Sequence, residues 1–528
     1  MAFYYLAVIA ARNHQWEMAR GFIEKSLVKN DHNVKARGLK ATILRCLNLQ
    51  EENEKWMQAN LKLDPFDYRT LFEQVFSGEE KQLDVIDERS REFHETYLQI
   101  ARDYAECGCY KEACEVLKNC RSDKPMIHYY TAYYQELLGN QSEAEEETFY
   151  AEKASPLYCF PNKLEDIRVL EAAISRNPKG AKAYYYLGCL YYDKLQFDKA
   201  IGLWETSECL DDTYPTLLRN LAVASYNKKS DPERARKCLE RAFELDPTDA
   251  RVFLELDQLY KKLHMTAEKR LENYKKHLEL IQERDDLYTE YVTVLNLCRQ
   301  YKAAYDAVMD HQFRAWEGAE GRITTQYKTA LLEMAKEAMR AGMYEQAKEY
   351  LEKAMLYPEN LGEGRLEGTK DNHLFYTLGL VLEHLGQENE AKECYKKATL
   401  GTMEPAGMLY YYDQPADMIL YQGLAQKKLE NQPEANTRFY KLVDYGEKHV
   451  RDHVKLDYFA VSLPDFLIFE EDLDKRNQAH CYYLMGLGML GLGNDEKARE
   501  NFEKALVLDP AHENAAIYLH MTGIIEVY

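Results

Sequence analysis

Aromatic and charged side chains gather in four segments of the C-terminal half of the chain, and they are the residues best suited to recognise a ligand. The segments span residues 312–324, 357–370, 401–416 and 446–477. Loops that combine glycine with aromatic and carboxylate side chains commonly recognise sugars or peptides. The candidate partner- or ligand-binding residues here are Trp316, Glu317, Glu320, Glu363, Arg365, Tyr411, Tyr412, Asp413 and Asp465.

The chemistry open to these side chains is hydrolysis of a glycosidic bond, which needs two carboxyl groups flanking the bond. Glu317, Glu320, Glu363 and Asp413 could supply such a pair. The sequence otherwise contains no H-E-x-x-H helix, no G-x-S-x-G turn and no zinc-type cysteine cluster. It therefore predicts no catalytic residue, no cofactor and no metal ion, and it indicates no activity by this chain alone.

A repeated helix-turn-helix pattern must position these segments. Between residues 181 and 214, Leu187, Gly188 and Tyr191 mark one apolar helix face, and Ala200 and Trp204 mark the next. Small residues at this spacing let two helices cross closely, with the large side chain packed between them. The pattern resembles the tetratricopeptide repeat of about 34 residues. It predicts an all-α, right-handed superhelical solenoid of such repeats with long inter-repeat loops.

The spacing of the repeats shows where the extra residues lie. The eighth position of successive units is Gly188, Ala222, Asp257, Val292, Ala335, Gly379, Gly423 and Gly486, at steps of 34, 35, 35, 43, 44, 44 and 63 residues. In the later units the second helix keeps its small residue twelve positions further on, so the additions follow the second helix. Because these connections share one edge of a solenoid, the four segments should form one continuous wall.

The longest of the four segments is too apolar for a solvated linker. We therefore expect Phe459, Phe466 and Phe469 to be buried against another part of the molecule. Two interpretations of the wall remain open besides ligand binding: the loops pack into the groove, or they dock another domain.

Repeats are predicted along nearly the whole chain. The prediction places N-terminal repeats at 1–156, an extra helix that joins the arrays at 157–180 and C-terminal repeats at 181–528. An apolar helix near residues 71–76 is followed by a polar connection. The first helix exposes an apolar face in this scheme, which raises the hypothesis of a homo-oligomer formed through that end.

The inner face of the solenoid is a second candidate surface. The fifth position of the first helix points into the groove, and it is tyrosine at Tyr185 and Tyr376. An aromatic groove with polar tips would hold an extended peptide. The alternative is that these tyrosines only pack between repeats.

Composition limits the partners. The net charge is −21, from 68 Lys and Arg against 89 Asp and Glu, without a basic block. Nucleic acid and anionic membranes are therefore poor partners. The 12 cysteines form no C-x-x-C pair, which suits a reducing cytoplasm. The apolar stretch at residues 3–11 lacks a preceding Lys or Arg, so neither a signal peptide nor a membrane span is predicted.

Several segments resemble the C-terminal tetratricopeptide half of a large bacterial family. They are CFPNKLEDIRVLEAAISRNP, YYYLGCLYYDKLQFDKAIGLWE, WEGAEGRITTQY, YYYDQPADMILYQGLA and DYFAVSLPDFLIFEEDLDKRNQAHC. The N-terminal half of that family is a β-sandwich domain of unknown function, similar to sugar-mutarotase domains. This chain has no β-rich region, so the resemblance implies a separate β-sandwich partner and a link to carbohydrate metabolism.

Two functions follow from these observations. The preferred one is a cytoplasmic interaction scaffold that binds a protein or domain partner through the loop wall and the groove. The alternative is the helical half of a carbohydrate-binding or carbohydrate-active assembly that a β-sandwich domain completes.

Overall fold

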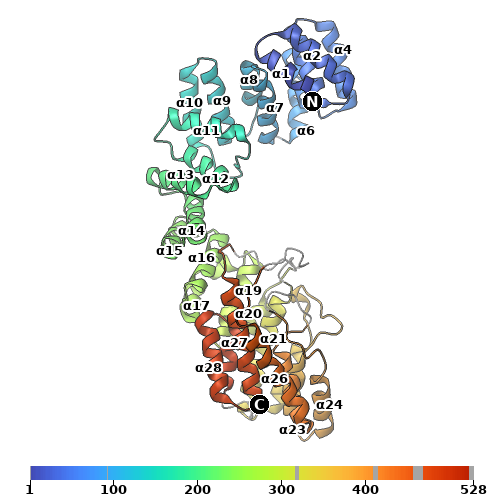
Figure 1. Cartoon of the computed structure of the whole chain (residues 1–528), viewed down its shortest axis with the longest axis vertical. Helices are drawn as coiled ribbons and strands as arrows, with labels where there is room; N and C mark the ends of the chain where they lie inside the picture. Colours follow the sequence, from blue (N-terminus) through green and yellow to red (C-terminus); the bar gives the residue numbers. More distant parts are fainter. Residues whose placement is uncertain (1, 92, 315–319, 408–413, 456–467, 523–528) are drawn as a thin grey trace. The chain divides into compact units, whose positions relative to one another are not determined.

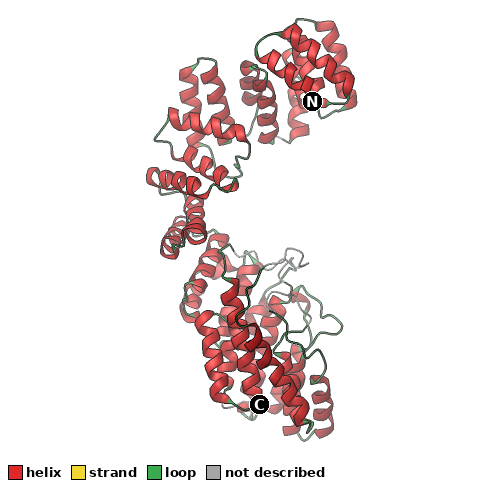
Figure 2. Ribbon diagram, viewed as in Figure 1, coloured by secondary structure: helices red, strands yellow, loops and turns green. Residues whose placement is uncertain are grey.

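The computed structural model confirms the predicted all-α fold. It describes residues 2–91, 93–314, 320–407, 414–455 and 468–522. These residues form α-helices, one short 3-10 helix and loops, and none of them is in a strand (Figure 2). Consecutive helices pack as antiparallel pairs, and the first helices of neighbouring pairs also contact each other. The first helices therefore form one layer and the second helices another, as expected for stacked repeats.

The chain divides into two compact units, Met1–Leu217 and Leu218–Tyr528. Figure 1 labels the helices in chain order. The first unit contains α1 (Ala2–Arg12), α2 (Trp16–Lys29), α3 (Val34–Cys46), α4 (Gln50–Leu63), α5 (Tyr68–Phe76), α6 (Gln82–Ser90), α7 (His94–Glu106), α8 (Tyr110–Lys118), α9 (Pro125–Leu137), α10 (Gln141–Lys153), α11 (Leu164–Arg176), α12 (Ala181–Asp193) and α13 (Phe197–Leu210).

The boundary between the units falls within α14 (Pro215–Lys229). The second unit continues with α15 (Pro232–Leu245), α16 (Ala250–Lys262), α17 (Ala267–Lys276), α18 (Leu278–Ile281), α19 (Asp285–Leu297), α20 (Tyr301–Asp310), α21 (Arg322–Arg340), α22 (Tyr344–Ala354), the 3-10 helix η1 (Glu359–Leu361), α23 (Asn372–His384), α24 (Glu388–Ala398), α25 (Met418–Lys428), α26 (Gln432–His449), α27 (Leu473–Gly491), α28 (Asp495–Leu508) and α29 (Glu513–Met521).

Small residues on the first helices allow the pairs to pack closely. A Cβ atom added at Gly188 would lie 2.5 Å from the Trp204 ring, and one at Gly423 would lie 2.3 Å from the Phe439 ring. Gly379 against Tyr395 and Gly486 against Phe502 repeat this arrangement. The predicted pairing of a small residue with a large side chain sixteen positions later is therefore confirmed in these repeats.

The turn between the helices of a pair is equally regular. One residue of each turn has a positive φ in the left-handed region, whether or not it is glycine. Leu195 (φ 60°) and Glu430 (φ 61°) adopt it at a steric cost of about 1–2 kcal/mol. The constant turn explains why the twelve-residue spacing survives while the other connections lengthen.

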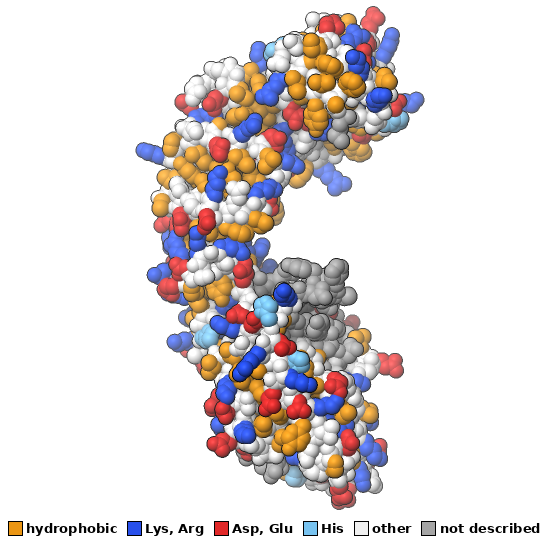
Figure 3. Space-filling view, viewed as in Figure 1, with side chains coloured by type: hydrophobic (Ala, Val, Ile, Leu, Met, Phe, Trp, Pro, Cys, Tyr) orange, Lys and Arg blue, Asp and Glu red, His pale blue; other side chains and the backbone are white. Residues whose placement is uncertain are grey.

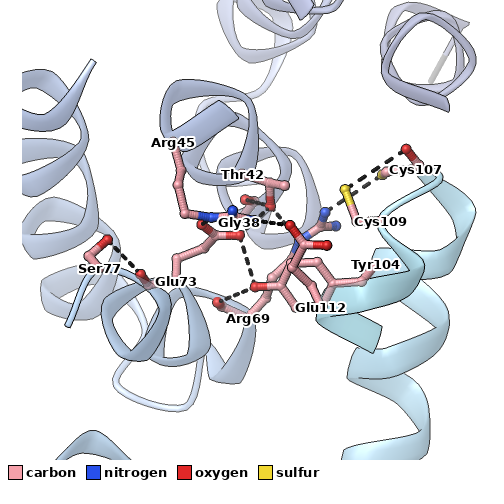
Figure 4. A network of polar contacts seen from close by, with 10 residues as sticks. All are labelled: Gly38, Thr42, Arg45, Arg69, Glu73, Ser77, Tyr104, Cys107, Cys109 and Glu112. Carbon is pink, nitrogen blue, oxygen red and sulfur yellow. Dashed lines mark hydrogen bonds and ion pairs between the residues drawn. The ribbon is translucent and has the colours of Figure 1, made fainter. Parts of the chain in front are cut away.

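A buried polar cluster joins α3, α5 and α7 of the first unit (Figure 4). The Glu73 carboxylate, which is inaccessible to solvent, accepts hydrogen bonds from Thr42 (2.8 Å), Arg45 (2.7 Å) and Tyr104 (2.9 Å). The buried Arg69 donates to Thr42 (3.2 Å) and lies 5.0 Å from the Tyr104 ring centroid. Because a buried carboxylate is stable only with such donors, the cluster fixes how these three helices meet.

Several element boundaries differ from the sequence prediction. The segment after residue 76, expected as a polar connection, contains helix α6. The first insertion ends at residue 321, since α21 begins at Arg322, and the last is confined to 450–472 because α26 and α27 extend into it. The predicted extra helix is α11, which packs against α9, α10 and α12 and so continues the first unit. Amphipathic helices can lengthen without a change of repeat spacing, so the spacing did not reveal these extensions.

Substituting Gly188 by alanine is expected to destabilise the protein by about 1–3 kcal/mol, because the new methyl group overlaps the Trp204 ring. Gly202→Ala, on the exposed side of the adjacent helix α13, is the matched control, since a Cβ there has no neighbour within 4 Å. It should stabilise by about 0.5–1 kcal/mol through helix propensity. Urea unfolding of both variants measures the difference, and equal shifts would contradict the packing described here.

Candidate interaction surface

We call the described residues of the long connections in the second unit the loop edge: residues 311–314, 320–321, 355–371, 399–407, 414–417, 450–455 and 468–472. Its first two members are joined directly. The Phe313 amide donates to the Asn360 carbonyl oxygen (2.8 Å), and the Asn360 side chain donates to the carbonyl oxygens of Val308 (2.7 Å) and His311 (2.9 Å). The two neighbouring insertions therefore lie side by side, as predicted for this part of the wall.

Two predicted carboxylates meet at this junction. The Gly321 amide donates to both oxygens of Glu363 (2.9 and 3.2 Å). Partial burial raises the pKa of Glu363, and the negative charge of Glu320 raises it further, while the Gly321 hydrogen bond lowers it. Glu320 and Glu363 are thus close in space, although they come from different insertions.

Arg365 is held at the start of α23. Its guanidinium donates to the buried carboxylate of Asp371 (2.9 Å), which also pairs with Lys328 of α21 (3.3 Å). A buried partner therefore fixes the exposed Arg365 side chain. Because the side chain is already ordered, it loses little further conformational entropy when a partner binds.

The third insertion is closed at its base. The Gln414 side chain accepts from the Thr402 amide (2.9 Å) and donates to the Thr402 carbonyl oxygen (2.7 Å). Gln422 of α25 donates to the same oxygen (3.0 Å). The His480 ring of α27 donates to the Ala406 carbonyl oxygen (2.9 Å), so this loop also contacts the helix that follows the fourth insertion.

The end of the fourth insertion reaches the first helix of the unit. Phe469 is fully buried against Tyr226 of α14, with ring centroids 5.1 Å apart. Asn227 donates to the Ile468 carbonyl oxygen (2.8 Å) and accepts from the Glu470 amide (2.8 Å). Burial of Phe469 is as predicted, but its partner helix was not foreseen. Phe459 and Phe466 lie outside the described residues.

Three leucines of the loop edge are exposed. Leu356 is 68%, Leu366 is 72% and Leu400 is 60% accessible. Leu356 and Leu400 occupy the same place in successive repeats, two residues after the second helix ends. Apolar side chains repeated along one edge are a feature of docking surfaces.

The remaining predicted residues are distributed as follows. Glu320 is exposed at the end of the first insertion. Tyr185 and Tyr376 are buried among other rings: Tyr185 lies 4.8 Å from Tyr214, and Tyr376 lies 5.9 Å from Tyr421. Their burial favours the alternative that they pack between repeats. The residues outside the described part of the chain are Trp316, Glu317, Tyr411, Tyr412, Asp413 and Asp465.

The inner face of the second unit, formed by its first helices, is covered by the chain's own helix α29. Tyr518 of α29 contacts Tyr421 of α25 and Tyr483 of α27. Gln326 of α21 donates to Glu513 (2.8 Å). Sequence analysis missed this arrangement, although the apolar residues at 515, 518 and 521 give the feature that could have indicated it.

Burial changes the acidity of the groups on this face. It raises the pKa of Asp417 to about 6 and that of Glu513 to about 7. It lowers the pKa of His373 to about 3, with Lys328 adding to the effect. Near pH 5 the carboxyl groups of Asp417 and Glu513 are therefore mostly protonated and the His373 imidazole is mostly neutral.

In the first unit, apolar side chains gather over the N-terminal helices on the face drawn in Figure 3. Tyr5 and Ile9 of α1 are exposed large apolar residues. The homo-oligomer hypothesis that the sequence raised for this end stays a prediction. No described helix combines the length and apolar character of a bilayer-spanning segment. Within the described part of the chain, no group of three or more acidic, histidine or cysteine side chains is placed to hold a metal ion.

Comparison with family models assigns the helix pairs. Models described as tetratricopeptide repeat match residues 220–249, 373–400 and 479–512, which fall on α14/α15, α23/α24 and α27/α28. The chain contains tetratricopeptide repeats. The matched tetratricopeptide repeats all lie in the second unit, and two of them directly precede or follow members of the loop edge.

Solved structures similar to the tetratricopeptide-repeat chain have low identity to it. The APC/C hetero-tetramer Cut9-Hcn1 is 12% identical, with 98% of this chain and 95% of that chain covered and a TM-score of 0.25. MamA from Desulfovibrio magneticus is 17% identical, with 36% and 97% covered and a TM-score of 0.22. YrrB, titled a TPR protein with an unusual peptide-binding site, is 14% identical, with 44% and 96% covered and a TM-score of 0.18.

Glu513→Gln is expected to raise the melting temperature at pH 8 and to leave it unchanged at pH 5. Because the pKa of Glu513 is about 7 when folded, the folded state retains a proton that the unfolded state releases between about pH 4.5 and 7. Stability therefore falls as the pH rises through this interval, by at most about 1.4 kcal/mol per pH unit. The amide of the Glu513→Gln variant does not ionise, so the variant does not lose this stability as the pH rises.

The charged groups that act on Glu513 are Lys261, Glu290 and Glu333, and they remain in the variant. The control is Glu500→Gln on α28, whose exposed carboxylate pairs with Lys504 at 2.6 Å. It should not raise the melting temperature at pH 8. A pH-independent difference between Glu513→Gln and the wild-type chain would contradict the assignment.

Proposed function

We propose that this chain is a protein-interaction scaffold whose second unit binds a protein or domain partner through the loop edge and the inner face. Tetratricopeptide repeats present extended surfaces to protein partners, which supports the general role. The finer assignment rests on the exposed leucines at 356, 366 and 400. When a partner covers such side chains, the removal of apolar surface from water stabilises the complex by about 25 cal/mol per Å².

Rigidity supports the same proposal. The first two insertions are joined by one backbone hydrogen bond and by the Asn360 side chain, and Arg365 is anchored to Asp371. A surface that is ordered before binding loses less conformational entropy when its partner docks. Arginine is also enriched among the residues that contribute most of the binding energy of protein interfaces.

The alternative role, the helical half of a carbohydrate assembly, has one supporting observation. Glu320 and Glu363 approach each other at the junction of two insertions, and the pKa of Glu363 is raised. A carboxyl group with a raised pKa next to another carboxylate is an arrangement that sugar hydrolysis uses. A β-sandwich partner would complete such a site.

Photo-crosslinking residues placed at Leu366 and Leu400 test the scaffold role in cells that express the chain. Both positions are expected to crosslink to the same protein, because they lie on one edge. Val507, equally exposed on α28, is the matched control and should not crosslink to that protein. The double variant Leu366→Ala/Leu400→Ala should lose at least tenfold in affinity for the identified partner, while Val507→Ala keeps it. Equal crosslinking at Val507, or none at the loop positions, would overturn the loop edge as the binding surface.

The carbohydrate role predicts that a saccharide raises the melting temperature of the wild-type chain and that Glu363→Gln abolishes the rise. Arg340→Gln, on the far end of α21 from the insertions, serves as the control. A panel of saccharides that leaves both the melting temperature and the tryptophan fluorescence unchanged would eliminate this alternative.

A further inference from the structure

Helix α29 carries a narrow apolar stripe that the inner face buries. Ala515, Tyr518 and Met521 recur at every third position and are all buried. A helix of nine residues is not stable alone in water, so α29 depends on this contact for its conformation. Anchors at such spacing are typical of a helix bound in a groove.

Aromatic rings form the centre of the surface against which α29 packs. The Tyr518 ring lies 6.4 Å from Tyr421, 6.0 Å from Tyr483 and 6.1 Å from Phe502, measured between centroids. Its hydroxyl is within hydrogen-bonding distance of the Tyr421 hydroxyl (3.2 Å) and of the Asp417 carboxylate (3.4 Å). Side chains of α25, α27 and α28 thus converge on Tyr518.

Polar groups of α21 contact both ends of α29. Gln326 binds Glu513 at the first turn (2.8 Å), and the Lys336 ammonium lies 3.7 Å from the Met521 sulfur at the last. Lys336 is itself buried beside Glu333 (2.6 Å). Helix α21 therefore runs along the whole length of α29.

The fit of α29 is incomplete. Glu513 Oε1, Asn296 Oδ1 and His373 Nδ1 are buried atoms of this region that have no hydrogen-bond partner in the described structure. Each such atom costs about 1–3 kcal/mol relative to a satisfied one. Asn296 and His373 belong to the face, whereas Glu513 belongs to α29 itself. A helix that supplied partners to Asn296 and His373 would occupy the face more favourably than α29 does.

We infer that the inner face of the second unit is a helix-binding site that α29 occupies in cis. The partner that fits it is an amphipathic helix with an aromatic residue and a methionine or similar unbranched residue three positions apart. Binding of this helix displaces α29 from Tyr421, Tyr483 and Gln326. The inference rests on the proposed scaffold function and specifies which kind of partner the inner face takes.

A fluorescein-labelled peptide of residues 509–522 tests the inference in trans with the full-length chain. The wild-type chain should bind it weakly, because α29 fills the site. Tyr518→Ala in the full-length chain removes the central anchor and should strengthen peptide binding at least tenfold, measured by fluorescence anisotropy. Met521→Ala, at the edge of the stripe, should give an intermediate increase and guards against a folding defect of the first variant.

Two controls define the outcome. Tyr440→Ala, at an exposed ring of α26, should leave peptide binding as weak as in the wild-type chain. A peptide carrying Tyr518→Ala should not bind any of the chains. Failure of both Tyr518→Ala and Met521→Ala chains to bind the peptide, with helix content retained by circular dichroism, would overturn the inference. Equal binding to the wild-type chain would overturn it too.

Crosslinking at Leu366 and Leu400 reports on the loop edge and does not involve α29. If those positions capture a partner while no chain binds the peptide, the scaffold function stands and only the helix-binding site is lost.

Discussion

The close approach of a glycine on one helix to a large side chain on the next is the constraint on which four repeats of this chain depend. At Gly188, Gly379, Gly423 and Gly486 even one added methyl group would lie within 2.6 Å of a ring. Such contacts fix the crossing of the two helices and leave little freedom to slide. Since each repeat contacts only its neighbours, a correct crossing in one pair determines where the next begins.

In the repeat formed by α16 and α17, polar side chains join the two helices. Asp257 occupies the position that glycine holds elsewhere, and it accepts hydrogen bonds from Arg270 (2.9 and 2.6 Å) and Tyr274 (2.7 Å). All three side chains are buried. Like the cluster around Glu73, this arrangement is stable because each charge has several partners. Removing Arg270 would leave the buried carboxylate of Asp257 without its opposite charge.

The second unit adds contacts that an open solenoid lacks. Phe469, in the connection after α26, is buried against Tyr226 of α14, and α29 lies across α19, α21, α25 and α27. Contacts of this kind join parts of the unit that are distant in sequence, so the unit is more cooperative than a chain of nearest neighbours. They also mean that the inner face is already occupied, while the loop edge with its exposed leucines remains accessible.

The sequence by itself determined the repeat period, the helix pairs and the four places where residues were inserted. These features are local: the twelve-residue spacing and the sixteen-residue pairing of Gly188 with Trp204 depend only on helix geometry and a constant turn. It also determined that Phe469 would be buried, because an apolar segment of that length cannot remain solvated. Only the tertiary structure decided what covers it. Asn227 and Ile468 are 241 residues apart, and their meeting depends on the path of the five repeats between them.

The same limit applies to the candidate sites. Sequence spacing placed Glu320 and Glu363 on neighbouring connections, and the structure brings them together. The sequence could not show that the side chains of Tyr185 and Tyr376 pack among other aromatic rings and do not line an open groove. The environment of a helix side chain depends on the helices stacked beside it. The tertiary structure also determines the position of α29. Small changes in the twist per repeat accumulate along a solenoid, and they determine which distant helices the short apolar stripe of α29 can contact.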